Sequence, residues 1–376
     1  MTFNLRKVAR RALYTLAFAG AGFGAAGTAL AQPLDVAALP SYKPEKQLTG
    51  SIRILGSPLR DNIEPLLKAF LKYQPGLRYG ANFVPNSEGA ISGLYNGLAD
   101  IAPAGDDAKI TDMMPFFDTF GYLPTEISIA SGGYGRGKLW PAAFVVHKDN
   151  PLTQITVDQI ARVFGAERSG GWEGIETSSD HNFRYTTRFA RSAASNIRTW
   201  GQLGVKGALA NKPIQTYGYV APGFKIYFER KLLHWSTKWN PNLFEFVEPI
   251  HAPGPEDAAV TAKGAMEAMS KDKYALGWVM PSQLADHPEL KVLAVAAQEG
   301  GPYVPLNQDT VANRTYPLVR DAYVYINRKP GQPLNPIVRE FLRFVLSREG
   351  QTLIASLGSY NPLPADVIAK QLAKIE

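Results

Sequence analysis

The stretch "SIRILGSPLRDNIEPLLKAFLKYQPGLRYGANFV" at residues 51–84 decides the fold class, because it reads as strand, helix and strand in turn. Residues 51–57 predict a strand that runs into a turn, and Asp61 is placed to cap the helix that follows. Residues 77–84 predict the second strand. The helix has one apolar face with the i, i+3, i+4, i+7, i+8 spacing, made of Ile63, Leu66, Leu67, Phe70 and Leu71. This order favours an α/β fold with a mainly parallel sheet flanked by crossover helices.

The same alternation of strands and helices continues along the chain. Thr156 and Gln159 have the spacing of a capping box, which predicts a helix after Thr156. Residues 166–197 are rich in Ser, Gly and Arg and break the pattern, so they predict an insertion or a long surface loop. Further helices are expected at 223–235, 335–346 and 347–358, and further strands at 142–151, 212–220, 274–280 and 321–328.

The first 31 residues have the layout of a secretory signal peptide. An apolar stretch rich in Ala and Gly ends in a small-residue cleavage site at 29–31 and follows four basic residues, Arg6, Lys7, Arg10 and Arg11. The alternative is a retained membrane anchor, although the stretch is only weakly hydrophobic. With cleavage after residue 31, we expect a periplasmic or secreted protein with a linker at 32–48 ahead of two lobes.

The composition excludes several function classes. The leader holds four basic residues and no acid, so its removal lowers the formal net charge from +7 to +3 and weakens a nucleic-acid-binding role. The chain has no Cys, which excludes disulfides, thiolate metal sites and a lipid anchor on an N-terminal Cys. The five His include no i, i+4 pair, and the sequence shows no nucleophile motif and no paired catalytic carboxylates. We therefore expect no metal, no cofactor and no enzymatic activity.

Three loops that follow predicted strands are candidate ligand positions, because open parallel sheets bind ligands at the carboxyl ends of their strands. The loop "LGSPL" carries Ser57, "PNSEGAISGL" carries Ser87 and Gly89, and "VAPGFK" carries Gly223 and Lys225. A hydroxyl beside exposed backbone N–H groups suits an oxyanion. The alternative for Ser57 and Ser87 is a plain role as helix N-caps.

The C-terminal part of the chain resembles the periplasmic phosphate-binding proteins of ABC importers. The stretch "EFLRFVLSREGQTLIASLGSYNPLP" (340–364) is similar to that family's closing signature of two helices and a Tyr-x-Pro-Leu-Pro segment. "RTYPLVRDAYVYINR" (314–328) resembles its Tyr-Pro-Leu strand, and weaker resemblance is found in "YALGWV" and "NPLTQITVDQIARVFGAERSGGW". The resemblance covers most of 50–364 apart from 166–197.

The resemblance implies a type II periplasmic-binding-protein fold, in which two α/β lobes joined by hinge strands close on a ligand. The expected first lobe comprises 49–138 and 311–376, and the expected second lobe comprises 139–310. The implied function is that of a monomer that captures phosphate or a related oxyanion and delivers it to an ABC permease in the inner membrane.

In that family phosphate is held by hydroxyls, backbone N–H groups, an Arg, and an Asp that accepts the proton of phosphate. Ser57 and Ser87 match the hydroxyl positions, and Asp100 in "ADIAPAGD" matches the Asp. A buried acceptor of this kind rejects fully ionised sulfate, because two facing acceptors would stay unsatisfied. The alternative for Asp100 is a turn acid that accepts from neighbouring backbone N–H groups.

The second-lobe motif departs from that of the family. The family has an Arg and then Ser-Gly-Thr before a helix, whereas this chain has "YGYVAPGFKIYFE" (217–229). The Arg and two hydroxyls are missing, and Pro222 removes a backbone donor. A bound dianion then needs another cation, for which the candidates are Lys225, Arg184, Arg188 and Arg191. The competing hypothesis is the same fold diverged to a periplasmic sensor or scaffold, or to a binder of an organic anion or a protein partner.

Overall fold

The computed structural model describes residues 36–56, 59–83, 89–105, 107–135, 137–138, 141–175, 183–219, 224–247 and 255–376, without the side chains of 255–261. The chain divides into two units, Met1–Ala31 and Gln32–Glu376, and every described residue belongs to the second unit. The leader predicted at 1–31 therefore lies outside the described residues.

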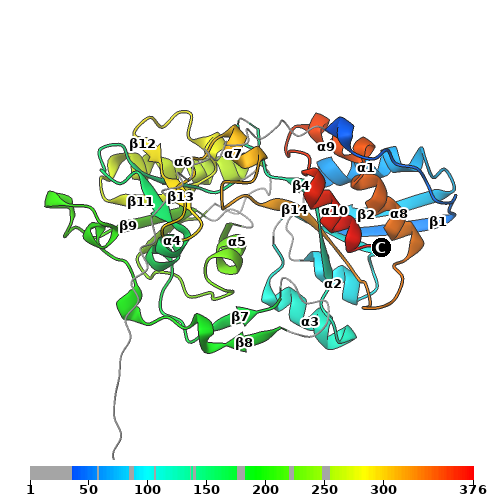
Figure 1. Cartoon of the computed structure of the whole chain (residues 1–376), viewed down its shortest axis with the longest axis horizontal. Helices are drawn as coiled ribbons and strands as arrows, with labels where there is room; N and C mark the ends of the chain where they lie inside the picture. Colours follow the sequence, from blue (N-terminus) through cyan, green and yellow to red (C-terminus); the bar gives the residue numbers. More distant parts are fainter. Residues whose placement is uncertain are drawn as a thin grey trace, which may run out of the picture. The chain divides into compact units, whose positions relative to one another are not determined.

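A five-stranded sheet forms the core of the first lobe, which we define as residues 36–131 and 320–376 (Figure 1). In sheet order its strands are β2 (Leu77–Phe83), β1 (Gly50–Gly56), β3 (Ile101–Ala104), β14 (Asp321–Ile326) and β4 (Thr125–Ser131). β1 is parallel to β2 and β3, whereas β14 is antiparallel to β3 and β4. The parallel strand pair predicted from 51–84 is confirmed, and the sheet as a whole is mixed.

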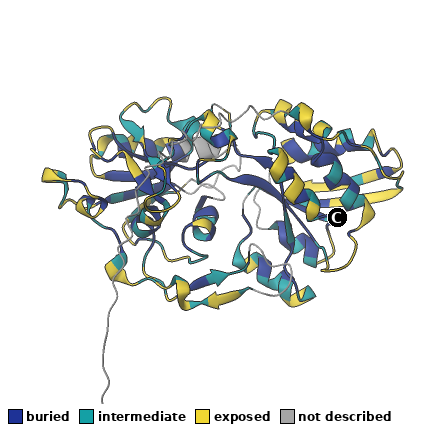
Figure 2. Ribbon diagram, in the orientation of Figure 1, coloured by how far each residue is buried: buried dark blue, intermediate teal, exposed yellow. Residues whose placement is uncertain are grey.

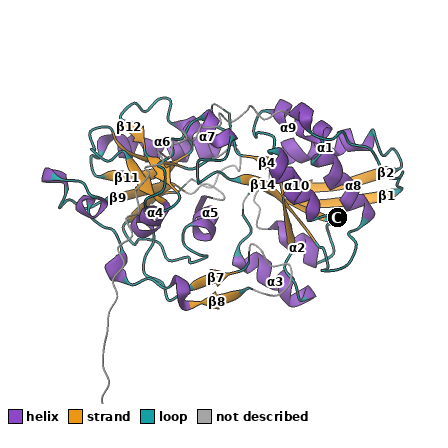
Figure 3. Cartoon of the chain, in the orientation of Figure 1, coloured by secondary structure: helices purple, strands orange, loops and turns teal. Residues whose placement is uncertain are grey.

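Helices cover both faces of this sheet (Figure 3). The helices of the first lobe are α1 (Arg60–Leu71), α2 (Ala90–Tyr95), α3 (Ile110–Phe120), α8 (Pro336–Val345), α9 (Arg348–Leu357) and α10 (Ala365–Ala373). Alternate residues of β14 face opposite ways, so Val324 packs with α1 and α8 while Tyr325 packs with α2 and α3. One face is therefore covered by α1, α8, α9 and α10, and the other by α2 and α3.

The predicted helix after the first strand is confirmed, with one correction at its start. Four of its expected apolar residues have no exposed surface: Ile63, Leu66, Leu67 and Phe70. The helix begins at Arg60 after Leu59, and no side chain caps it. Asp61 therefore lies inside the first turn, where its charge still favours the positive end of the helix dipole. The helices expected at 335–346 and 347–358 are confirmed as α8 and α9.

A second five-stranded sheet forms the core of the second lobe, which we define as residues 141–319 (Figure 2). In sheet order its strands are β10 (Leu243–Phe246), β9 (Gln215–Tyr219), β11 (Ala275–Val279), β5 (Ala143–His147) and β12 (Leu290–Val292). β9 is parallel to β10 and β11, and β5 is antiparallel to β11 and β12. A small parallel pair, β6 (Gln154–Thr156) and β13 (Ala294–Ala296), adjoins α4. The strands expected at 142–151, 212–220 and 274–280 are confirmed.

The helices of the second lobe are α4 (Val157–Phe164), α5 (Phe224–Lys231), α6 (Pro255–Lys271) and α7 (Gln308–Ala312). The predicted capping box at α4 is confirmed. Thr156 Oγ1 accepts from the backbone N of Gln159 at 3.1 Å, and the backbone N of Thr156 donates to Gln159 Oε1 at 2.9 Å. The helix expected at 223–235 is confirmed as the shorter α5.

The predicted insertion at 166–197 contains a hairpin and short 3-10 turns. β7 (Gly171–Glu173) and β8 (Arg184–Thr186) pair antiparallel, and 3-10 turns follow at Thr187–Phe189 and Ala193–Ser195. The hairpin therefore projects from the second lobe as a separate small element (Figure 1).

Two connections join the lobes, and they run side by side. Ser131 pairs with Asp321, and the backbone N of Gly132 donates to the carbonyl oxygen of Arg320 at 2.8 Å. Tyr316 and Leu318 still pack in the core of the second lobe, so the chain returns to the first lobe at about residue 320. The boundaries expected at 138 and 311 stay predictions. Within the described ranges, no helix combines the length and the apolar character needed to cross a bilayer.

Candidate functional site

The carboxyl ends of β1, β2 and β3 lie at one edge of the first sheet, because these strands are parallel. β1 ends at Gly56, where an added Cβ would lie 2.3 Å from the carbonyl oxygen of Pro103. Only glycine fits this close approach of β1 to β3. Ligands of open α/β sheets bind at this kind of edge, so it is the candidate binding edge of the molecule.

Of the four predicted ligand residues Ser57, Ser87, Gly89 and Gly223, the structure describes Gly89 alone. Gly89 directly precedes α2, and its carbonyl oxygen accepts from the hydroxyl of Ser92 at 2.8 Å. Ser57, Ser87 and Gly223 lie outside the described residues. Contact of all four with a ligand stays a prediction.

Asp100 lies at the other end of β3, directly before its first residue, Ile101. Arg53 donates to both carboxylate oxygens of Asp100, through its backbone N at 2.8 Å and through Nη2 at 2.7 Å. The two side chains are 50% and 20% exposed and line a surface cavity of about 510 Å³. Asp100 is therefore paired with Arg53 of the neighbouring strand, at the opposite end of β3 from the candidate binding edge. The expected role of Asp100 stays an untested prediction.

A buried acid does follow the carboxyl end of β3. Asp107 comes three residues after Ala104, and its side chain has no exposed surface. Arg320 Nε donates to Oδ2 of Asp107 at 2.7 Å, and Arg230 Nη1 donates to Oδ1 at 2.8 Å. The side chains of Arg320 and Arg230 are 0% and 5% exposed. Both oxygens of Asp107 are therefore held by charge-assisted hydrogen bonds in a dry environment.

Arg230 reaches this acid from the second lobe. It lies on α5, whose Phe224 and Phe228 are buried in the core of that lobe. The guanidinium of Arg230 also binds Glu126 on β4, with Nη1 2.7 Å from Oε2 and Nη2 3.0 Å from Oε1. We call Asp107, Glu126, Arg230 and Arg320 the buried charge cluster. It joins one helix of the second lobe to β4, to the loop after β3 and to the residue that directly precedes β14 in the first lobe.

Tyrosines complete the surroundings of the cluster. Tyr325 donates its hydroxyl to Glu126 Oε2 at 2.6 Å and accepts from the backbone N of Ala108 at 3.0 Å. The ring of Tyr323 lies 5.7 Å from the guanidinium of Arg230 and 5.8 Å from that of Arg320. The π face of Tyr323 therefore lies near both cations.

The charges in the cluster stabilise one another. Burial by itself would raise the pKa of Asp107, but the positive charges of Arg320 and Arg230 outweigh burial and lower it. Burial would likewise lower the pKa of Arg230, but Glu126 and Asp107 raise it well above its ordinary value. Burial raises the pKa of Tyr325, and the charge of Glu126 adds to this rise. Asp107 is therefore an anion and Arg230 a cation at neutral pH.

Three of the cations expected to replace the family's Arg are engaged elsewhere. Lys225 pairs with Glu245 at 3.1 Å and lies 5.4 Å from the ring of Trp239. Arg184 and Arg188 both pair with Glu173, at 3.2 and 2.8 Å, and both are more than two thirds exposed. These side chains have carboxylate partners of their own within the second lobe.

The fourth expected cation, Arg191, holds the end of α4. Its Nη1 donates to the carbonyl oxygen of Ala161 at 2.8 Å, and its Nη2 donates to that of Ala166 at 2.7 Å. Burial lowers the pKa of Arg191 to about 10, and the nearby charge of Arg168 adds to this effect. Arg198 donates to further carbonyls at the same helix end. A cation at a helix C-terminus is favoured by the dipole, so Arg191 has a structural role here.

The sequence reasoning missed Asp107, Arg230 and Arg320. The rule that ligands gather at carboxyl ends of strands could have found Asp107, because "GDD" (105–107) follows the strand that Asp100 precedes. Arg320 directly precedes β14, which begins at the same edge because it is antiparallel to β3. Arg230 gives no such signal, since it lies 123 residues from Asp107 in the sequence.

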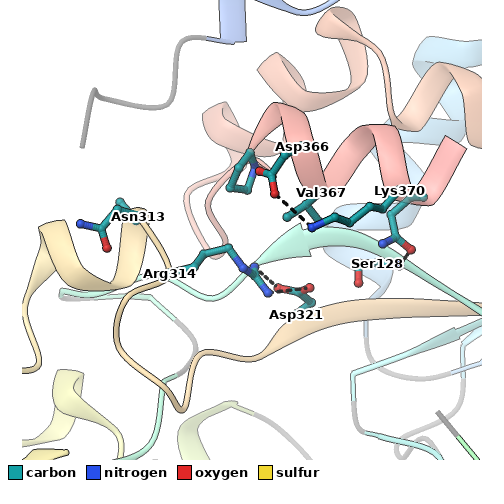
Figure 4. Close-up of a pocket in the computed structure, with 10 residues that line it drawn as sticks. Ser128, Asn313, Arg314, Asp321, Asp366, Val367 and Lys370 are labelled. Atoms are coloured by element: carbon teal, nitrogen blue, oxygen red, sulfur yellow. Dashed lines mark hydrogen bonds and ion pairs between the residues drawn. The ribbon is translucent and has the colours of Figure 1, made fainter. Parts of the chain in front are cut away.

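A separate cavity of about 490 Å³ lies beside the connections between the lobes (Figure 4). Arg314 projects into it and pairs with Asp321 at 2.7 Å, while Lys370 pairs with Asp366 at 3.3 Å. Both cations thus have acidic partners inside the cavity. In the described part of the chain, no three His, Cys, Asp or Glu side chains gather as a metal site would require.

Comparison with curated proteins shows similarity along nearly the whole chain. The phosphate-binding protein PstS of Pseudomonas aeruginosa is 29% identical over 371 residues, which cover 97% of this chain and 98% of that protein. Protein SphX of Synechococcus elongatus is 27% identical over 237 residues, 60% of this chain and 56% of that protein. The resemblance found at 340–364 and 314–328 is confirmed by this similarity.

Comparison with solved structures and family models agrees on the fold. The crystal structure of PstS from Borrelia burgdorferi has a TM-score of 0.52 and 14% identity, over 84% of this chain and all of that chain. This likeness confirms the predicted two-lobed α/β fold class. A family model described as the PBP superfamily domain matches residues 140–349. Because this match spans more than half of the sequence, the chain belongs to the PBP superfamily.

Proposed function

We propose that this protein captures inorganic phosphate, or a closely related oxyanion, and delivers it to an ABC-type permease. The observation that carries this proposal is the similarity to the phosphate-binding protein PstS over 97% of the chain. The protein acts as a binding component and catalyses no reaction on its ligand. It works outside the cytoplasm after loss of residues 1–31, as a monomer that meets the permease in the inner membrane.

We propose that the ligand binds at the carboxyl edge of the first sheet. Ser57, Ser87 and Gly89 belong to the loops after β1 and β2, and Gly223 precedes α5. Hydroxyls and backbone N–H groups at such positions are suited to hold an oxyanion. The ligand-facing acid is assigned to the loop after β3, which contains Asp106 and Asp107, in place of Asp100.

Arg230 and Arg320 supply the positive charge near this loop. Arg230 and Arg320 are paired with Asp107, the acid that follows β3, whereas Lys225, Arg184 and Arg188 are paired with acids within the second lobe. The family's cation precedes the helix that corresponds to α5. In this chain we assign that role to Arg230, which lies within the helix, six residues after its first residue, Phe224.

Equilibrium dialysis with labelled phosphate tests the site assignment. The exported protein is compared with Asp106→Asn and Ser87→Ala, with Asp100→Asn as the matched control at the other end of β3. We expect the first two variants to weaken phosphate binding at least tenfold, because each removes a hydrogen-bonding partner of a charged ligand. Asp100→Asn should bind as the unaltered protein does. Loss of binding in Asp100→Asn alone would restore the original assignment.

One observation favours a second function, the capture of a different anion or of a protein partner. The family's Arg corresponds to Tyr217 or Gly218 of β9 in this chain, and both residues pack against neighbouring side chains. A Cβ added to Gly218 would lie 2.6 Å from Trp278 Nε1, so no larger side chain fits there. Tyr217 donates its hydroxyl to Asp272 at 3.0 Å. Native mass spectrometry of the exported protein distinguishes the two functions, since a retained organic anion or a bound protein would favour the second.

A further inference from the structure

Away from the connections between the lobes, the described residues of the two lobes contact each other in two regions. One is the ion pairing of Arg230 with Asp107 and Glu126. The other is made by the hairpin arm. We define the arm as the described residues 168–175 and 183–191, which include the paired strands β7 and β8. In Figure 1 this arm lies below α5 and beside α3.

The base of the hairpin arm is fixed to the second lobe. The backbone groups of Arg168 and Arg191 exchange two hydrogen bonds, both of 2.9 Å. The backbone N of Trp172 donates to the carbonyl oxygen of His234 at 3.1 Å. The ring of Phe189 stacks on His234 with centroids 3.9 Å apart and planes at 11°. His234 closely follows α5, so the arm and the helix that carries Arg230 belong to one structural block.

The far end of the hairpin arm packs on the first lobe. The ring of Phe183 meets that of Phe117 on α3 edge-on, with centroids 4.9 Å apart. Trp172 lies 6.0 Å from Phe183, and Ile175 is only 7% exposed within the same apolar cluster as Met113 and Phe116 of α3. The arm therefore adds apolar side chains of the second lobe to the cluster that covers one face of the first sheet.

The ion pairs of Arg230, like the contacts of the hairpin arm, join a residue of the second lobe to residues of the first lobe. Arg230 is fixed to the second lobe by α5, while Asp107 and Glu126 belong to the first lobe. Trp235, just after α5, covers the guanidinium at 5.7 Å and packs against the apolar cluster of α3. Separation of the lobes would break these ion pairs and expose the aromatic contacts at the same time.

We propose that Arg230 and the hairpin arm form an interlobe clasp, which holds the two lobes closed through the protein's own contacts. Both sets of contacts are between protein groups, so the closed arrangement does not require a ligand charge to bridge the lobes. Ligand exchange then requires the clasp to open. This inference concerns closure alone, and it stands or falls independently of which anion the protein binds.

Distance measurement between two spin labels tests the clasp directly. The chain has no Cys, so two introduced cysteines carry the only labels. Leu98→Cys in the first lobe and Lys206→Cys in the second are suitable sites, because both positions are exposed. The exported, phosphate-stripped protein is measured with this pair in four backgrounds: unaltered, Arg230→Gln, Phe183→Ser, and both changes together. Far-UV circular dichroism and thermal melting verify that each variant is folded.

We expect one dominant label distance in the unaltered protein without phosphate. Each single variant should raise the population of a second, different distance about tenfold or more, since each loses a charged hydrogen-bond pair or a buried aromatic contact. The double variant should populate mainly the second distance. Arg53→Gln, whose ion pair stays within the first lobe, should keep the original distribution.

Two outcomes would overturn the clasp. The first is an unaltered, phosphate-free protein that already populates both distances equally. The second is a folded double variant with the distribution of the unaltered protein. Neither outcome depends on phosphate affinity, which is measured separately on the same samples. A protein that is clasped but does not bind phosphate would disprove the proposed ligand and leave the clasp intact.

Discussion

An acid lies at each end of β3, and the two acids differ in their partners, in their burial and in whether a partner comes from the other lobe. Asp100, at the amino end, pairs with Arg53 of the neighbouring strand, and its side chain is 20% exposed. Asp107, beyond the carboxyl end, is fully buried between Arg320 and Arg230, and the second of these comes from the other lobe. An exposed local pair contributes little to stability, whereas a buried pair makes each partner depend on the other. The two acids thus differ in structural role, and our proposal places the ligand site at the end of β3 that carries Asp107.

The largest expected effect comes from Asp107→Asn. The change removes the carboxylate that pairs with Arg320 at 2.7 Å in a site with no exposed surface. Removing one partner of a buried ion pair typically lowers the free energy of unfolding by about 3–5 kcal/mol. Urea unfolding followed by tryptophan fluorescence measures this loss. Asp100→Asn is the matched control and should lose only about 0–1 kcal/mol, as exposed pairs do. Equal losses of unfolding free energy in the two variants would contradict the claim that Asp107 contributes more to stability than Asp100.

A smaller loss is expected from Arg230→Gln, because Asp107 keeps Arg320 and Glu126 keeps the hydroxyl of Tyr325. Hydrogen bonds between charged groups contribute about 1.5–3 kcal/mol, so the free energy of unfolding should fall by that amount. Arg53→Gln, whose side chain is half exposed, serves as the control with a change below about 1 kcal/mol. If Arg230→Gln is no less stable than this control, Arg230 does not tie the lobes together.

At acidic pH, the free energy of unfolding should depend on pH in the way that the lowered pKa of Asp107 predicts. A carboxyl whose pKa is lower in the folded than in the unfolded state stabilises the fold above its unfolded pKa of about 4, and this contribution disappears as the pH falls through the folded pKa. The difference in unfolding free energy between the unaltered protein and Asp107→Asn should therefore be constant from pH 7 to about pH 5 and shrink below about pH 4. A difference that instead grows on acidification would contradict this sign.

The smallest effects are expected from the cations of the second lobe that the sequence had suggested as ligands. Arg188→Ala should change the free energy of unfolding by less than about 0.5 kcal/mol, because the side chain is 72% exposed. Phosphate affinity should also be unchanged in Arg188→Ala and in Lys225→Ala. Dialysis with labelled phosphate checks both variants, and a tenfold loss in either one would return that cation to the binding site.

The sequence predicted the elements of the fold well where local rules act. The apolar spacing of Ile63, Leu66 and Leu67 placed α1, and the capping box of Thr156 placed the start of α4, because both signals involve residues within one or two helix turns. The cap expected from Asp61 was wrong, since the helix begins at Arg60, two residues earlier than a cap at Asp61 implies, and has no side-chain cap. Periodicity fixes the face of a helix more firmly than its first residue.

The candidate site was predicted less well, because its contacts join residues far apart in the sequence. Arg230 and Asp107 are 123 residues apart, and Arg320 and Asp107 are 213 residues apart. Patterns of neighbouring residues in the sequence cannot predict ion pairs between residues so far apart. Asp100 was favoured because "ADIAPAGD" resembles the family's Asp-containing segment. The structure places Asp100 directly before β3, at the opposite end from the candidate binding edge, and its ligand role stays a prediction.

Calorimetric titration of a protein comprising residues 32–376 with phosphate, sulfate and arsenate tests the central claim most directly. Unfolding and refolding the protein beforehand removes any ligand that it carries from the cell. We predict that phosphate and arsenate bind with micromolar or tighter affinity and that sulfate releases no heat, because an acid that accepts the ligand's proton excludes a fully ionised anion. A refolded protein that binds none of the three oxyanions would contradict the proposed function.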